Sequence, residues 1–126
     1  MKILLVDDDT FLRDMYATKF IECGHDVTTA VHAADALRII EQAPNAFELV
    51  IVDMIMPGMT GVELMVELHK VHPETKSKFI VLSNQGQDQD IDEAKAAGAI
   101  GYIIKAQSVP SEVVKRVEEI VNEGKS

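Results

Sequence analysis

The sequence predicts an α/β protein with a doubly wound, five-stranded parallel sheet of strand order 2-1-3-4-5, the flavodoxin-like (βα)5 arrangement. Short apolar runs alternate with longer amphipathic stretches in five successive units, which indicates a parallel sheet with helices on both faces. Three of the runs, 3–6, 49–52 and 79–82, are apolar without a break, as in strands buried on both sides. The right-handed crossover rule leaves few topologies for such a chain, and the order 2-1-3-4-5 is a common one.

The first two units are each predicted from an apolar run and the breaker that follows. Residues 2–6 (KILLV) are rich in strand-forming residues and end in a polar cluster. The stretch 10–23 carries apolar residues at helical spacing, and Gly24 ends it. A second strand is predicted over 26–31 and a second helix over 33–42, which stops before a proline.

The remaining elements follow the same pattern. They are predicted, strand and helix in turn, over residues 49–52, 61–71, 79–82, 90–97 and 102–104, and a last helix begins at Pro110. Pro73 and Gly98 end two of these helices. The last helix carries a stripe of valine and isoleucine between charged residues, which is typical of a helix that packs on a sheet by one face.

Composition and charge limit the classes of function. With 126 residues, 47% of them hydrophobic, the chain is suited to one globular domain over residues 1–126. Its net charge of −9 argues against direct nucleic-acid binding, which needs a cationic face. The apolar run 3–6 is too short for a signal sequence or a membrane span, and the single cysteine, Cys23, forms no internal disulfide. These features predict a cytoplasmic protein without direct membrane contact.

Polar residues stand where the predicted strands end. Asp7 and Asp8 follow the first strand, Asp53 the third, Ser83 the fourth and Lys105 the fifth. The carboxyl ends of parallel strands share one edge of a sheet, and ligands bind there between strands 1 and 3, where the strand order reverses. We therefore expect the three aspartates to converge, with the serine and the lysine beside them.

The charges of this group predict a metal site that takes phosphoryl groups. Three carboxylates and one ammonium sum to −2, and carboxylates that lie close together repel unless a cation joins them. Mg²⁺, or Mn²⁺, prefers such oxygen ligands and keeps coordination positions open for phosphate oxygens. Aspartates form aspartyl phosphates, and Asp53, at the end of a rigid buried strand, is the predicted acceptor.

Each of these residues has a simpler explanation when it is taken singly. Asp9 fits a helix N-cap, Asp53 a turn former and Lys105 a solvated surface amine. Their joint placement at one sheet edge is what favours a phosphoryl-accepting site.

Four motifs resemble the receiver domain of two-component response regulators, of the single-domain chemotaxis or sporulation-regulator type. They are ILLVDDD (3–9), VIVDMIMPGMTG (50–61), FIVLSN (79–84) and GYIIKA (101–106). Each motif alone is weak, but the combination is specific, and the resemblance covers essentially the whole chain.

The resemblance implies a role for each residue of the site. Asp53 would be the phosphorylated aspartate, and Lys105 would pair with the phosphoryl oxygens. Asp8 would bind Mg²⁺ directly and Asp7 largely through water, while Ile55 would offer its backbone carbonyl to the metal.

The resemblance also implies a switch and partners. Ser83 would move toward the phosphoryl group and Tyr102 would change between inward and outward positions, altering the surface near the fourth helix, fifth strand and fifth helix.

The phosphoryl donor would be a histidine kinase or a histidine phosphotransfer protein, and the phosphoprotein would act on an output partner or effector domain within a phosphorelay. A dimer that forms on phosphorylation is compatible with the sequence. Such a protein is not an enzyme beyond its own phosphorylation and dephosphorylation.

Three positions depart from the usual pattern of that family. Asn84 follows the switch hydroxyl, where a small residue is usual. Ala106 replaces the usual proline after Lys105, which predicts a trans turn because a cis bond without proline costs roughly 2.5–4 kcal/mol. Ile55, with Gln85, flanks the path of an attacking water, which predicts a moderately long-lived aspartyl phosphate.

Two other functions compete with the switch. One is a degenerate receiver that acts only as a protein-binding module, against which the intact set of site residues argues. The other is a phosphatase resembling the haloacid dehalogenases, whose D-x-D-x-T/V motif is not matched by Asp7-Asp8-Asp9-Thr10-Phe11.

Overall fold

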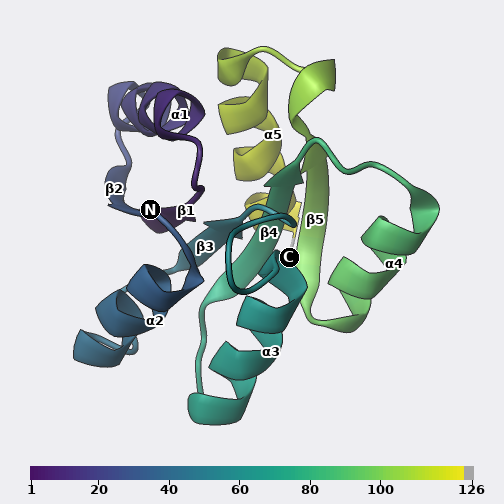
Figure 1. Ribbon diagram of the computed structural model, residues 1–126. Helices are drawn as coiled ribbons and strands as arrows, with labels where there is room; N and C mark the ends of the chain where they lie inside the picture. Colours follow the sequence, from purple (N-terminus) through teal and green to yellow (C-terminus); the bar gives the residue numbers. More distant parts are fainter. Residues whose placement is uncertain (124–126) are drawn as a thin grey trace.

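A five-stranded parallel sheet forms the centre of the molecule, seen here in a computed structural model that describes residues 1–123 (Figure 1). Its strand order is β2-β1-β3-β4-β5, so the predicted fold class and strand order are confirmed. The strands are β1 Lys2–Val6, β2 Asp26–Ala30, β3 Leu49–Val52, β4 Lys78–Ser83 and β5 Ala99–Ile104. Residues 124–126 of the predicted domain lie outside the described residues.

Helices cover both faces of the sheet. They are α1 Thr10–Glu22, α2 Ala33–Gln42, α3 Gly61–Val71, α4 Asp88–Ala96 and α5 Pro110–Glu123, and the 3-10 turn η1 spans Lys105–Gln107. Figure 1 shows α1 and α5 on one side of the sheet and α2, α3 and α4 on the other. None of the helices within residues 1–123 has the length and apolar character needed to span a membrane.

Two apolar cores follow from this layering. On β1, Leu4 and Val6 pack toward α2, α3 and α4, whereas Ile3 and Leu5 pack toward α1 and α5. The central strands show the same alternation between two buried faces, which is why their sequence runs are apolar without a break. These strands are fixed from both sides and form a rigid support for the residues that follow them.

The predicted element boundaries differ from the observed ones chiefly around β5. The fifth strand was predicted over 102–104, but it begins at Ala99 and includes Gly101. A Cβ at Gly101 would lie 2.7 Å from Cδ1 of Ile120, so this glycine allows α5 to cross close to the strand. Gly101 therefore belongs to β5 and permits the close approach of α5. The prediction took this glycine as a strand boundary and so began the strand too late.

The fourth helix also begins earlier than predicted, at Asp88 instead of residue 90. The Asp90 carboxylate accepts a hydrogen bond from the backbone N–H of Gln87 at 3.2 Å, which holds the first turn. An acidic residue in the first turn also complements the helix dipole.

Candidate functional site

Three carboxylates converge at the carboxyl edge of the sheet. Asp7 and Asp8 follow β1 and Asp53 follows β3, and each offers a carboxylate oxygen within 4.8 Å of the others. Their environments differ: Asp7 is buried, Asp53 is half-buried and Asp8 is exposed. The predicted convergence of the aspartates at this edge is found in the structure.

Lys105 lies between two of these carboxylates. Its buried Nζ donates hydrogen bonds to Oδ2 of Asp7 at 2.6 Å and to Oδ2 of Asp53 at 2.8 Å. Burial acts to lower the pKa of Lys105, but the hydrogen bonds and charges of Asp53 and Asp7 outweigh burial and raise that pKa. The ammonium therefore stays charged between the two carboxylates, and it is not the solvated surface amine that its sequence position alone suggests.

Every polar group of Asp7 has a partner. Its N–H donates to the carbonyl of Ala30 at 3.2 Å, and its carbonyl accepts from Nη1 of Arg13 at 2.8 Å. Its carboxylate accepts from the N–H of Asp9 at 3.0 Å as well as from Lys105. Burial raises the pKa of Asp7 in spite of these donors. Asp8, in contrast, has a carboxylate that no described residue binds.

Besides Lys105, a hydroxyl from β4 and a backbone N–H from its own loop hold the Asp53 carboxylate. The hydroxyl of Ser83 donates to its Oδ1 at 2.8 Å, and the N–H of Ile55 reaches the same oxygen at 3.2 Å. A Cβ at Gly61 would lie 2.3 Å from the carbonyl oxygen of Asp53, so only glycine allows α3 to start this close to the end of β3. The spacing D-x-x-M-P-x-x-x-G thus has a steric reason.

Tyr102 is linked to Ser83 through the backbone of one residue, Gln85. Its hydroxyl donates to the backbone carbonyl of Gln85, and the N–H of Gln85 donates to Oγ of Ser83 at 3.2 Å. Burial, reinforced by Asp90 and Asp53, raises the pKa of Tyr102 to about 12. Gln85 was not predicted to take part here, because it acts through backbone atoms that leave no mark on the sequence.

Arg13 and Tyr16 are two further residues near the site that sequence reasoning missed. Both lie on the buried face of α1. Burial raises the pKa of Tyr16, and the charges of Lys105, Asp7 and Asp53 act on its hydroxyl. For Arg13 the sequence held a signal: a charged residue stood at helical spacing among the apolar residues of that face.

Two of the three departures from the usual receiver pattern, Asn84 and Ala106, lie together beside Lys105. Asn84 is exposed, and with Ala106 it lines a shallow hollow of about 330 Å³ next to the lysine. No peptide bond within residues 1–123 is cis, so the predicted trans turn after Lys105 is observed, as the 3-10 turn η1.

The donor set at this edge fits a small divalent cation. All three carboxylates offer oxygen, the ligand that Mg²⁺ and Mn²⁺ prefer, and one of them, Asp8, is exposed and uncommitted. Three carboxylates and one ammonium leave an excess charge of −2 that a divalent cation would neutralise. At the same edge a hydroxyl and an ammonium contact the carboxylate of Asp53, a group type that can act as a nucleophile.

Comparison with known proteins gives one consistent result. The family model of the response regulator receiver domain matches residues 3–118. The chain is 31% identical over 120 residues to the chemotaxis protein CheY of Thermotoga maritima, which covers 94% of this chain and 96% of that protein. It is 34% identical over 105 residues to the two-component response regulator ORR24 of Oryza sativa subsp. indica; the match covers 83% of this chain but only 16% of that longer protein.

A solved structure gives the same relationship in three dimensions. A CheY-like response regulator receiver domain protein from Methanospirillum hungatei JF-1 superposes with a TM-score of 0.82 at 30% identity. The superposition covers 98% of this chain and 95% of that one.

Proposed function

This chain belongs to the response regulator receiver domain family, and from that membership we propose that Asp53 takes a phosphoryl group from a phosphohistidine donor and thereby switches a partner-binding surface. Receiver domains are signalling modules of two-component systems and in general not enzymes. The observation that carries the proposal is the contact of the Asp53 carboxylate with both Ser83 and Lys105.

Phosphoryl transfer requires the protein mainly to position the reacting groups and to stabilise their charge. A carboxylate oxygen of Asp53 attacks the phosphorus, the phosphorus–nitrogen bond breaks, and the donor imidazole leaves with the bonding electron pair. Lys105 and Ser83 already contact the acceptor carboxylate, so each is close enough to turn to a phosphoryl oxygen. Asp8, Asp53 and the backbone carbonyl of Ile55 would hold Mg²⁺ or Mn²⁺, with Asp7 acting through water. The bound cation supplies positive charge to the phosphoryl oxygens.

The signal would leave the site through Ser83. When this hydroxyl turns to the phosphoryl group, its contact with the N–H of Gln85 changes. The carbonyl of the same residue accepts the hydroxyl of Tyr102, so the tyrosine responds to that movement. Tyr102 lies on β5, beside α4 and α5, and we place the output surface, and any dimer that forms on phosphorylation, on these elements.

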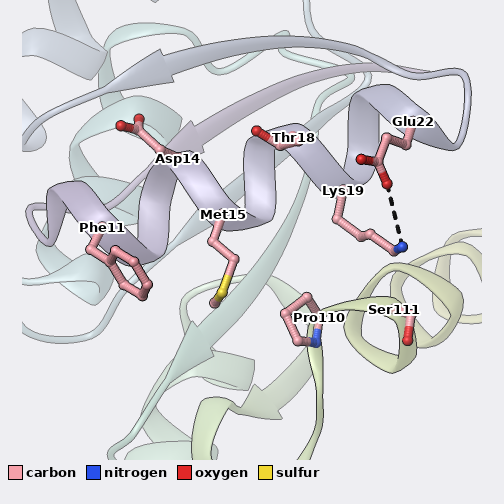
Figure 2. A pocket seen from close by; sticks show the side chains of 8 residues that line it. All are labelled: Phe11, Asp14, Met15, Thr18, Lys19, Glu22, Pro110 and Ser111. Carbon is pink, nitrogen blue, oxygen red and sulfur yellow. Dashed lines mark hydrogen bonds and ion pairs between the residues drawn. The ribbon is translucent and has the colours of Figure 1, made fainter.

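The phosphoryl donor would dock along α1. A hollow of about 570 Å³ lies between α1 and the start of α5. Figure 2 shows the residues that line it, Phe11 among them. Met15 and Pro110 line both this hollow and the one beside Lys105, so one continuous surface leads from α1 to the site. Phe11 is 76% exposed and lines this hollow, so its ring offers apolar surface to a docking partner. A histidine kinase or a histidine phosphotransfer protein seated here would bring its phosphohistidine to Asp53.

We further propose that the 126 residues act as one receiver unit in the cytoplasm.

A phosphoryl mimic distinguishes the switch from its alternatives. With beryllofluoride and Mg²⁺, amide resonances should shift at Asp53 and along the path through Ser83, Gln85 and Tyr102. No response would indicate a degenerate receiver that only binds proteins. Steady turnover of phosphate esters would indicate a phosphatase.

A further inference from the structure

Arg13 is a buried cation that forms no ion pair with any residue of the described chain. Its side chain lies on the inner face of α1, only 9% exposed, beside Tyr16 and Ala17. Within residues 1–123 no carboxylate forms an ion pair with it, and its Nε is buried without a hydrogen-bond partner. Such burial is costly, because a guanidinium loses its hydration and here recovers little of it.

Within the described residues, the Arg13 guanidinium makes one hydrogen bond, and its acceptor is the backbone of Asp7. Nη1 donates to the backbone carbonyl of Asp7 at 2.8 Å. That carbonyl belongs to the peptide plane that joins Asp7 to Asp8, and a planar peptide turns as one body. Fixing the carbonyl therefore fixes the direction in which the chain enters Asp8. Because Asp8 has no partner of its own among the described residues, its carboxylate depends on the backbone for its position.

We propose that Arg13 is a positioning residue, which holds the Asp7–Asp8 peptide so that the Asp8 carboxylate faces the divalent cation. The inference rests on the proposed function, because it requires a cation at this edge. In this proposal Arg13 acts on the position of Asp8 through its hydrogen bond to the Asp7 carbonyl, and not through its positive charge.

An action by charge and an action by position predict opposite changes in Mg²⁺ affinity when Arg13 is removed. If Arg13 acted by charge, its removal would take away a repulsive cation and Mg²⁺ would bind more tightly. If it acts by position, its removal frees the Asp7–Asp8 peptide and Mg²⁺ binds more weakly. Loss of a residue that orients a metal ligand commonly costs about 10-fold or more in affinity.

The test is a Mg²⁺ titration of the whole chain by calorimetry and amide shifts. Arg13→Met should raise the Kd for Mg²⁺ about 10-fold, and Arg13→Lys, which keeps one donor near the carbonyl, should recover part of the loss. Arg116→Met is the matched control, since it removes the same charge from an exposed position on α5 and should bind as the unmodified protein does. Thermal unfolding without Mg²⁺ separates a general loss of stability from the change in Kd.

An unchanged or smaller Kd in Arg13→Met would overturn the inference. If that variant does not fold, Arg13→Gln replaces it, because its shorter amide does not reach the carbonyl and the same weakening is expected. Absence of Mg²⁺ binding by the unmodified protein would instead contradict the proposed function, so the two failures are distinguishable.

Discussion

At the residue scale, three carboxylates of one chemical type have three different surroundings. Asp7 is buried and bound at every polar group, Asp53 is half-buried between a hydroxyl and an ammonium, and Asp8 is exposed and free of protein partners within the described chain. These surroundings suit a fixed anchor, an acceptor and a metal ligand respectively. Because the side chains are chemically identical, the proposed difference in their roles rests on the neighbouring atoms.

Titration of the tyrosines tests the surroundings of Tyr102. The chain has two tyrosines and no tryptophan, so tyrosinate absorbance reports on Tyr16 and Tyr102 alone. Both pKa values are raised, that of Tyr102 to about 12 from 10.0. The folded protein should therefore form little tyrosinate at pH 10, where the unfolded chain is half-titrated.

The same shift gives a dependence of stability on pH. Because the folded pKa of Tyr102 lies above the unfolded one, its contribution to stability is complete below pH 10 and is lost as the pH rises toward about 12. Tyr102→Phe should lack this loss in alkaline denaturation experiments. A Tyr102 that titrates near pH 10 in the folded protein would contradict the partial burial that raises its pKa.

The lifetime of the aspartyl phosphate is a second property set by single residues. Ile55 is 59% exposed beside Asp53, and the exposed Gln85 lies near Ser83, so both flank the approach of water. We expect a moderately long-lived phosphoryl group, followed by phosphate release from purified phosphorylated protein with Mg²⁺. Complete loss of the phosphoryl group within seconds would show that these side chains do not obstruct water.

At the element scale, the site depends on how closely helices approach strand ends. The start of α3 lies against Asp53, the first residue after β3, only because Gly61 lacks a side chain. The loop between β4 and α4 lies against Ile104 for the same reason, since a Cβ at Gly86 would be 2.6 Å from Cδ1 of that residue. Two glycines thus allow the packing that places Asp53 and the Ser83–Tyr102 connection.

Gly61→Ala should disturb both stability and function. The added Cβ meets the rigid backbone carbonyl of Asp53 at 2.3 Å, so the start of α3 must shift. We expect a loss of about 1–3 kcal/mol in the free energy of unfolding, the usual cost of overpacking, together with a weaker beryllofluoride response at Asp53. Denaturant titration and amide shifts measure the two effects.

Gly86→Ala is the control for Gly61→Ala. Its Cβ would meet the tip of the Ile104 side chain, which can rotate away, so its cost should be smaller. Equal stability of the two variants would mean that the contact between Gly61 and Asp53 does not constrain α3.

At the scale of the whole molecule, the sheet separates two cores and leaves one edge for chemistry. This architecture could be predicted from the sequence because unbroken apolar runs such as 49–52 specify strands buried on both faces. The convergence of Asp7, Asp8 and Asp53 followed from the strand order alone. The contacts of Arg13 and of the Gln85 peptide could not be predicted, because they depend on side-chain and backbone positions that the strand order does not fix.

Docking of the donor along α1 is tested at this same scale. Phe11→Ala should slow phosphoryl transfer from a phosphohistidine protein by about 10-fold, as loss of an interface residue worth about 1.4 kcal/mol would. Transfer from the small donor phosphoramidate needs no such surface and should be unchanged. Val66→Ala, at a residue 53% exposed on α3, is the matched control. A slower reaction of Phe11→Ala with both donors would place the effect in the site and not in docking.

The central claim is that Asp53 is the phosphoryl acceptor, and mass spectrometry after incubation with phosphoramidate and Mg²⁺ tests it most directly. The unmodified protein should gain one phosphoryl group, mapped to Asp53, and so should Asp9→Asn, which changes a neighbouring carboxylate that caps α1. Asp53→Asn should gain none. Uptake by Asp53→Asn at the level of the unmodified protein, or a phosphoryl group mapped to another residue, would contradict the assignment.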